Sequence, residues 1–249
     1  MKDRGKLGDP KFLKHYQETL EDIKNLKHIE ILKKKIKIDK VLTEQDYISN
    51  KFNVIDSGTT HINVIDSNDL ITTITSTVNL EFGAKIMDPV TGIILNNQMD
   101  DFYYPDNINI LQEVSNVPNL ARAKQIPLSS AAPVILENND EAIILGAAGG
   151  IRIPTSIIEV IFWLTLGFNL DDAINKPRFH HQSSPNVVYV ESSEKASVIN
   201  YLKNLGHVLE VSITNTVFTS VQGIIVKGFS NKIIHAVSDV RKGGKSAGD

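Results

Sequence analysis

The sequence predicts an α+β fold in which strands and helices occur in separate runs. Helix-favouring sequence fills roughly the first 40 residues, a β-rich pattern begins near residue 59, and helices are followed again by strands towards the C-terminus. Such an order is typical of layered α+β folds, whereas regular alternation of strand and helix indicates a parallel sheet. With 249 residues, of which 41% are hydrophobic, the chain is long enough for one large domain or two small ones.

Charge is distributed unevenly. Residues 1–51 contain 13 of the 26 Lys and Arg and 9 of the 29 Asp and Glu, a net charge of +4, so the remainder carries −7 and the whole chain −3. The basic residues form no stripe across the predicted core elements, and the sequence therefore predicts no nucleic-acid partner. The run from Lys33 to Lys35 fits either a polybasic address or, more simply, a solvated helix face.

Several function classes are excluded by residues that are missing. The sequence contains no cysteine, which excludes disulfides, thiolate metal sites and a cysteine nucleophile. Residues 1–5 are charged and lack the apolar segment of a signal peptide, and Ile157–Phe168 falls short of the roughly 20 residues of a membrane span. His180 and His181 are adjacent, and no third ligand accompanies them. We therefore expect a buried helix at residues 157–168, and neither a metal site nor a cofactor.

The first predicted helix begins at Asp9 and Pro10, a capping acceptor followed by proline at the first helical position. Helical spacing of apolar residues continues, with or without a break, to about Lys37. Residues 41–58 are polar and lose this periodicity, so we expect a linker there.

A hairpin is predicted to start at Thr59. Residues 60–66 and 70–78 are alternating and β-rich, and a turn cluster, Ser67–Asp69, joins them. Downstream helices are expected from near Pro154, after Asn169, and from about Glu194 to Gly206. Further strands are expected at residues 92–95, 132–136, 142–145, 208–212, 221–227 and 232–237.

The glycine-rich stretch Gly146–Gly150 has three interpretations: a phosphate cradle, a plain turn or an oxyanion hole. Phosphate binding has little support, because no Lys followed by Ser or Thr comes after the glycines. In an oxyanion hole, glycine lets backbone N–H groups approach a tetrahedral intermediate, and one such donor is worth about 3 kcal/mol.

Thr59 lies at the junction of the predicted linker and hairpin. A hydroxyl becomes a good nucleophile only when a base removes its proton, and an N-terminal threonine can use its own α-amine, whose ordinary pKa is about 8. Cleavage between Gly58 and Thr59 would create such a residue. The simpler alternative is that Thr59 and Thr60 merely favour a strand.

Seven motifs in a fixed order resemble the gamma-glutamyltransferase (glutathione hydrolase) family, and together they extend through residues 56–249. Residues 3–12 also resemble the end of that family's large subunit. The motifs are Gly58–Val64, Ser76–Gly83, Gly92–Phe102, Pro127–Ser130, Gly149–Gly150, Pro177–Gln182 and Ser238–Arg241.

The resemblance implies a partial αββα sandwich of the N-terminal nucleophile hydrolase type. It implies that the chain cuts itself between Gly58 and Thr59, and that Thr59 then attacks gamma-glutamyl amides such as glutathione and transfers the acyl group to water or an amino acceptor. Thr77 would orient or activate Thr59, and Gly149 and Gly150 would form the oxyanion hole.

The resemblance also assigns five substrate-binding residues. A gamma-glutamyl group carries an α-ammonium and an α-carboxylate, which require acceptors and donors respectively. The acceptor side is expected to be Asp101 with Asn79 and Gln98, and the donor side Ser129 and Ser130. Without the resemblance, these residues would be interpreted as a polar turn and a loop after proline.

The expected organisation has three parts: a helical end of a large-subunit-like region at residues 1–40, a linker at 41–58 and a catalytic domain at 59–249. The family's large subunit is the expected partner, as a heterodimer. Two alternatives are a light-chain-like protein without independent activity and a related acylase with another amide substrate. By family, location is the extracellular face of the plasma membrane, or secreted or periplasmic, and this chain does not decide between them.

Overall fold

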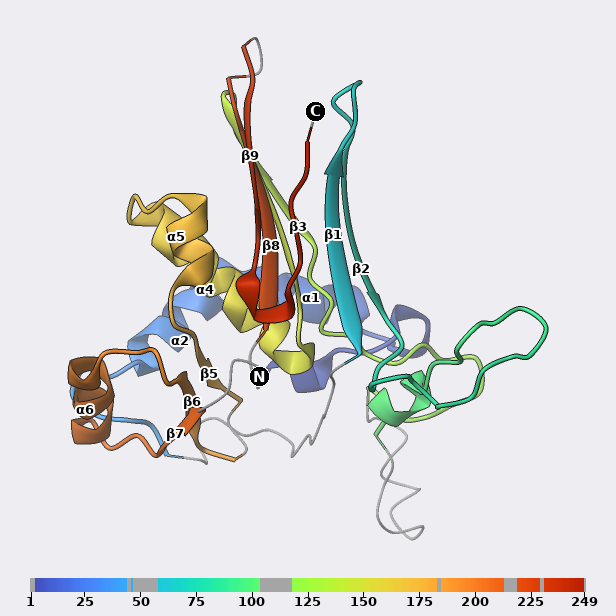
Figure 1. Ribbon diagram of the computed structural model, residues 1–249. Helices are drawn as coiled ribbons and strands as arrows, with labels where there is room; N and C mark the ends of the chain where they lie inside the picture. Colours follow the sequence, from blue (N-terminus) through green and yellow to red (C-terminus); the bar gives the residue numbers. More distant parts are fainter. Residues whose placement is uncertain are drawn as a thin grey trace, which may run out of the picture.

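The computed structural model describes residues 3–43, 46, 58–103, 118–182, 185–212, 219–228 and 231–248. Two antiparallel sheets face each other in its main body (Figure 1). The smaller sheet is a hairpin of β1 (Thr59–Ile65) and β2 (Ile71–Thr77). The larger sheet has the order β3–β4–β8–β9. Its strands are Val134–Glu137, Glu141–Ala148, Ser220–Lys227 and Ile233–Ser238.

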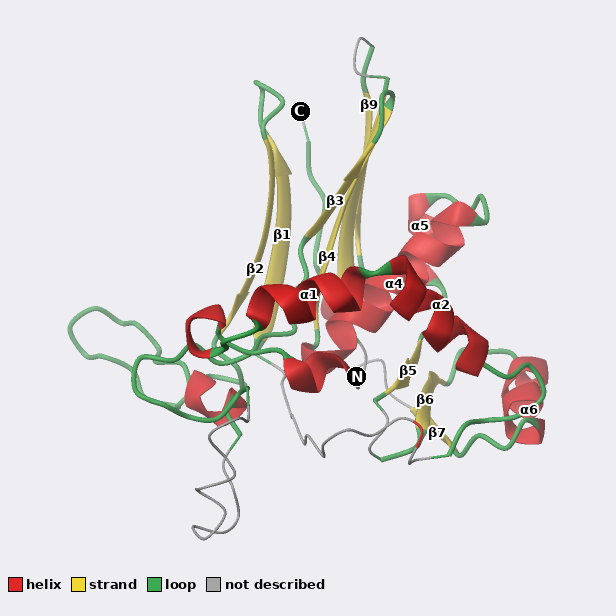
Figure 2. Cartoon of the chain, turned by 180° about the vertical axis from the view of Figure 1, so that it is seen from behind, coloured by secondary structure: helices red, strands yellow, loops and turns green. Residues whose placement is uncertain are grey.

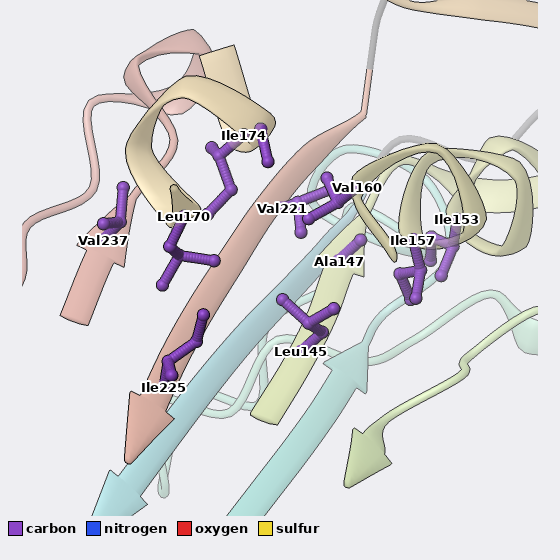
Figure 3. Close-up of a cluster of buried hydrophobic side chains, with 11 residues drawn as sticks. Leu145, Ala147, Ile153, Ile157, Val160, Leu170, Ile174, Val221, Ile225 and Val237 are labelled. Atoms are coloured by element: carbon purple, nitrogen blue, oxygen red, sulfur yellow. The ribbon is translucent and has the colours of Figure 1, made fainter. Parts of the chain in front are cut away.

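Both faces of the larger sheet are covered by apolar contacts, because successive strand residues point to opposite sides. On one face, Leu145 and Ala147 pack under helices α4 (Ile153–Thr165) and α5 (Leu170–Asn175) (Figure 3). On the other, Ala142 and Ile144 pack towards the hairpin. Complete burial of one such aliphatic side chain stabilises the fold by roughly 1.5–3 kcal/mol.

The outer face of the hairpin is open. Ile62 and Ile74 are directly paired across the strands and are 57% and 50% exposed. The described elements therefore form three layers, helix, sheet and sheet. Three layers agree with the predicted α+β class and with the prediction of a partial αββα sandwich, in which one of the four layers is missing from the described residues.

A third sheet, β5–β6–β7, lies beside this body together with α6 (Ala196–Asn204) (Figure 1). Its strands are Phe179–His181, Val188–Glu191 and Leu209–Ser212. In the view from behind, helices α1 (Tyr16–Lys24) and α2 (Leu26–Lys35) lie in front of the sheets (Figure 2). None of the described helices combines the length and apolarity needed to cross a bilayer.

A buried ionic cluster explains two of the sequence motifs. Arg178, 2% exposed, donates through Nη2 to Asp239 Oδ2 at 2.9 Å, and Asp239 is fully buried. Arg241 donates to both carboxylate oxygens of Glu191 at 2.6 and 2.7 Å. These contacts join the start of β5 to the end of β9, so both motifs hold the fold together.

Three expectations about elements were wrong. Asp9 does accept a hydrogen bond from Lys11 N, but only one 3-10 turn (Pro10–Phe12) follows, because Leu13 is extended, and α1 begins at Tyr16. Residues 92–95 form a single bridge, Met87 to Ile94, because positive φ angles at Lys85 and Gly92 interrupt the ladder. Residues 146–148 belong to β4, so the loop before α4 is shorter than expected. Most of the predicted linker, residues 44–45 and 47–57, lies outside the described residues.

Candidate active site

Thr59 is the first residue of β1 and is paired with Thr77, the last residue of β2. The Thr59 side chain is buried, and its Oγ1 donates to Thr77 Oγ1 at 3.2 Å. Thr77 Oγ1 in turn accepts from Asn79 N at 2.9 Å. The hairpin register therefore brings together two hydroxyls that the sequence separates by 18 residues.

The peptide before Thr59 is fixed by the end of β2. Gly58 N donates to Asn79 O at 2.6 Å, and Gly58 O accepts from Val78 N at 3.3 Å. A Cβ at position 58 would lie 2.3 Å from Leu80 O, so this close approach requires glycine. Thr59 is an internal residue here, and its nitrogen becomes an amine base only if the bond to Gly58 is cut.

Asn79 connects the hairpin to the turn that carries Gln98 and Asp101. Its φ of 73° is a left-handed conformation that asparagine tolerates better than most residues. Asn79 Nδ2 donates to Asn97 O at 3.2 Å, and its buried Oδ1 has no hydrogen-bond partner among the described residues. An acceptor oxygen is thus available beside the turn.

Gln98 and Asp101 are the two ends of a 3-10 turn, Gln98–Asp101, which places their side chains on the same side. Gln98 Nε2 donates to Asp101 Oδ2. Burial raises the pKa of the Asp101 carboxyl above its ordinary value, while the Gln98 hydrogen bond and the Arg4 charge act in the opposite direction. A cationic ligand would stabilise the ionised form of this carboxyl.

Ser129 and Ser130 lie in the segment that leads into β3. Ser130 is buried, and the exposed Ser129 accepts through Oγ from Ala131 N at 3.0 Å. The contacts described above join Thr59, Thr77, Asn79, Gln98 and Asp101 into one group. Ser129 Oγ instead bonds within its own loop, in the segment before β3.

Gly149 and Gly150 follow β4 with φ angles of 147° and 61°. A Cβ on Gly149 would lie 2.7 Å from Thr219 Oγ1, so a side chain does not fit there. Ala148, the neighbour of Gly149, lines the same cavity of about 580 Å³ as Thr59. Gly149 and Gly150 therefore directly follow a residue of the cavity that Thr59 also lines.

The same cavity lies between β1 and the larger sheet, where the C-terminal segment also runs (Figure 1). Lys242 and Lys245 are on its wall, but none of the five predicted substrate-binding residues is. Across the part of the chain that the structure describes, His, Asp and Glu nowhere form a group of three that could hold a metal ion.

His61 is a residue near the site that the sequence did not single out. It shares the inner face of β1 with Thr59, and its ring contacts Thr75 Oγ1 at 2.8 Å and Asn63 Oδ1 at 2.9 Å. The ring covers Gly146 of β4, where a Cβ would lie 1.9 Å from His61 Cε1. Burial lowers the pKa of the His61 ring. The alternation Thr59, His61 along one strand face was the available signal.

The adjacent His180 and His181 make structural side-chain contacts. His180 Nδ1 contacts Thr155 Oγ1 at 2.9 Å, and His181 Nε2 contacts Asn186 Oδ1 at 2.7 Å. The two rings therefore bond different parts of the chain, as expected for a strand.

Comparison with known proteins gives consistent matches. A family model described as "Gamma-glutamyltranspeptidase" matches residues 1–249. Glutathione hydrolase proenzyme 1 of Schizosaccharomyces pombe is 32% identical over 241 residues, which cover 95% of this chain and 37% of that protein. The chain thus spans about two-fifths of the length of the curated fission yeast relatives that it matches.

Two further matches are covered almost completely by this chain. "Putative inactive glutathione hydrolase 4" of Arabidopsis thaliana is 34% identical over 190 residues, which cover 75% of this chain and 99% of that protein. A crystallised mutant of Helicobacter pylori gamma-glutamyltranspeptidase has a TM-score of 0.64 at 30% identity, covering 73% of this chain and 99% of that one. A solved structure therefore matches about three-quarters of this chain.

Proposed function

The chain belongs to the gamma-glutamyltranspeptidase family, an enzyme family, and from this membership we propose that it carries the nucleophile of a gamma-glutamyl amide-cleaving enzyme. Glutathione and related gamma-glutamyl compounds are the proposed substrates, and water or an amino group the acceptor. The observation that carries the proposal is the hydrogen bond from Thr59 Oγ1 to Thr77 Oγ1, 3.2 Å long, beside the restrained Gly58 carbonyl.

The first proposed step is self-cleavage. Thr59 Oγ1 attacks the Gly58 carbonyl carbon and forms an ester, while the Gly58–Thr59 C–N bond breaks and the nitrogen takes up the hydroxyl proton. Water then hydrolyses the ester and releases Gly58 as a carboxylate. Thr77 orients the attacking hydroxyl, and the new α-amine of Thr59 becomes the base for turnover.

Turnover uses the same oxygen. The Thr59 α-amine takes the proton from Oγ1, which attacks the gamma-carbonyl, and the backbone N–H groups of Gly149 and Gly150 stabilise the resulting oxyanion. The C–N bond of the substrate breaks, the leaving amine receives the proton, and a gamma-glutamyl ester of Thr59 remains. Water or an amine attacks this ester and regenerates the hydroxyl.

We assign the head group to the five residues named from the sequence. Asp101, supported by Gln98 and the Asn79 Oδ1 acceptor, would bind the α-ammonium. Ser129 and Ser130 would donate to the α-carboxylate. This pairing of opposite charges favours an amino-acid head group over the uncharged substituent that another acylase would accept.

The proposed organisation keeps residues 1–40 as the end of a large-subunit-like region, 41–58 as the linker and 59–249 as the catalytic part. A large subunit of the same proenzyme is the proposed partner. The uncovered outer face of the β1–β2 hairpin supports this, because Ile62 and Ile74 would otherwise remain in water.

The test is cleavage and chromophore release in the full-length protein. We expect a cut between Gly58 and Thr59, seen by mass spectrometry, and release of nitroaniline from a gamma-glutamyl anilide, with Thr59→Ala losing both. Thr72→Val, a change on β2 away from the Thr59–Thr77 pair, is the control. An uncut wild-type protein that releases no chromophore would refute the proposal.

A second candidate function is supported by the short Arabidopsis relative, which this chain covers almost completely and whose printed name includes "inactive". A protein of that kind would bind a partner through the open hairpin face without cutting itself. The same experiment separates the two, because this alternative requires the wild type and Thr59→Ala to behave identically.

A further inference from the structure

Asn119 lies between the two loops that carry the proposed head-group residues. Its buried side chain donates through Nδ2 to the Asp101 carbonyl oxygen at 2.6 Å and accepts at Oδ1 from Leu128 N at 2.9 Å. Leu128 immediately precedes Ser129. One carboxamide therefore joins the backbone of Asp101 to the backbone next to the serines.

The main chain of Asn119 is itself fixed. Its carbonyl accepts from Tyr103 N at 2.8 Å, and Tyr103 forms a bridge with Leu120. The neighbouring Pro118 carbonyl accepts from Gln125 Nε2 at 2.9 Å. The carboxamide thus projects from a restrained loop and can transmit that loop's position to both of its partners.

Residues Gly8 and Asp9 near the N-terminus contact the loop that carries Asn119. Asp9, 5% exposed, accepts from Lys11 N at 3.0 Å and from Ile126 N at 2.9 Å. A Cβ on Gly8 would lie 2.5 Å from the Pro118 carbonyl oxygen, so the two segments are in close contact. Residues before the proposed cut therefore help to hold Asn119.

The ligand makes this connection significant. The α-ammonium and α-carboxylate of an amino acid are bonded to one carbon atom, so the distance between them is fixed. A pocket that binds both must hold its acceptor and its donors at a matching distance, and small displacements weaken such contacts steeply. Asparagine fits the connecting role, because its amide carries a donor nitrogen and an acceptor oxygen on one carbon atom.

We propose that Asn119 is a positioning residue that sets the spacing between the Asp101 carboxylate and the Ser129 and Ser130 hydroxyls, and so makes the pocket specific for an α-amino acid head group. This inference rests on the proposed function for its substrate class. Asn119 itself does not touch the ligand; it acts through the two loops that it joins.

Two substitutions separate the halves of the bridge. Asn119→Asp keeps an acceptor for Leu128 N but places an oxygen against the Asp101 carbonyl, and Asn119→Ala removes both bonds. We expect KM for a gamma-glutamyl anilide to rise about tenfold or more, the effect of losing one charge-assisted contact, with a smaller change in kcat. Self-cleavage, which needs no head group, should keep its rate.

Substrate discrimination gives a readout that a loss of stability would not change. A glutaryl anilide lacks only the α-amino group, so the wild type should prefer the gamma-glutamyl donor, and both Asn119 variants should lose most of that preference. Asn138→Ala is the matched control, because Asn138 also bonds two backbone N–H groups, at the distant β3–β4 turn. The control should retain wild-type KM and discrimination.

A binding arm makes the result independent of turnover. Calorimetry with L-glutamate and with glutarate on the full-length wild type should show stronger binding of glutamate, and the Asn119 variants should lose this difference. That outcome supports the inference even if the wild type fails to cleave itself, a failure that would refute only the proposed nucleophile. Unchanged KM and unchanged discrimination in both variants, or wild-type protein that does not distinguish the two ligands, would overturn the inference.

Discussion

Replacing Gly146 by alanine would put a methyl group where the His61 ring now lies. The added Cβ would be 1.9 Å from His61 Cε1 and 2.2 Å from Nε2, far below van der Waals contact. The ring cannot simply rotate away, because Thr75 and Asn63 hold its two nitrogens at 2.8 and 2.9 Å. Either these bonds break or the whole hairpin moves off the larger sheet.

The loss of stability can be estimated for both outcomes, a displaced hairpin and broken hydrogen bonds of the ring. Overpacking a well-packed core typically costs about 1–3 kcal/mol, and breaking the bonds of a buried ring costs a comparable amount. Gly146 is not among the residues with positive φ, so the alanine backbone adds no strain. We therefore expect Gly146→Ala to lower the free energy of unfolding by about 2 kcal/mol and to slow self-cleavage, because the hairpin also carries Thr59.

A double-mutant cycle tests the cause. His61→Ala removes the ring, so adding Gly146→Ala to it should cost far less than in the wild type, and the coupling energy should be at least about 1 kcal/mol. The measurement is urea denaturation of the four proteins, with the rate of self-cleavage followed in parallel. Additive effects of the two substitutions would refute the reasoning.

Three other predictions follow from the buried groups. Burial raises the pKa of Glu159 from 4.5 to about 7. The folded state therefore keeps a proton that the unfolded state loses, and stability falls as the pH rises through this range. Glu159→Gln should reduce that fall by roughly 3 kcal/mol between pH 4.5 and 8, measured by urea denaturation, and an unchanged pH dependence would contradict this prediction. Asp239→Ala leaves Arg178 buried without its carboxylate and should lower the free energy of unfolding by about 3–5 kcal/mol. Lys227→Ala breaks a pair between the exposed Lys227 and the partly exposed Glu141, and should lower it by at most about 1 kcal/mol. Similar losses in the two variants, measured by urea denaturation, would argue against the buried pair. Thr77→Val keeps the shape of the residue but removes its hydroxyl. It should slow self-cleavage and turnover by at least about 100-fold. An equal effect of Thr72→Val would show that the Thr77 hydroxyl has no part in the mechanism.

Much of the fold follows from local sequence. The alternation in residues 59–78 predicted the hairpin, and Asn169 does cap α5 by accepting from Asp172 N at 2.8 Å. Local patterns failed where the decisive contact is distant in sequence. Gly146 looks like part of a glycine loop, yet it is a strand residue whose missing side chain accommodates His61, 85 positions earlier.

In the candidate site, too, some features follow from local sequence and others depend on contacts between distant residues. The resemblance named nine residues, and local sequence could not show that Thr59 and Thr77 would be within hydrogen-bond distance until the hairpin register was known. Asn119 had no signal at all, because a single asparagine in a loop is typical of a turn. Its importance comes from contacts at residues 101 and 128, which only the folded chain brings together.

The central claim is that Thr59 becomes an N-terminal nucleophile. The most direct test is the intact mass of the C-terminal fragment of the full-length protein, measured before and after a brief reaction with a gamma-glutamyl anilide. We predict a fragment that begins at Thr59 and then gains the mass of one gamma-glutamyl group, attached at Thr59. A fragment that begins at another residue, or one that begins at Thr59 but never carries the acyl group while chromophore is released, would contradict the account.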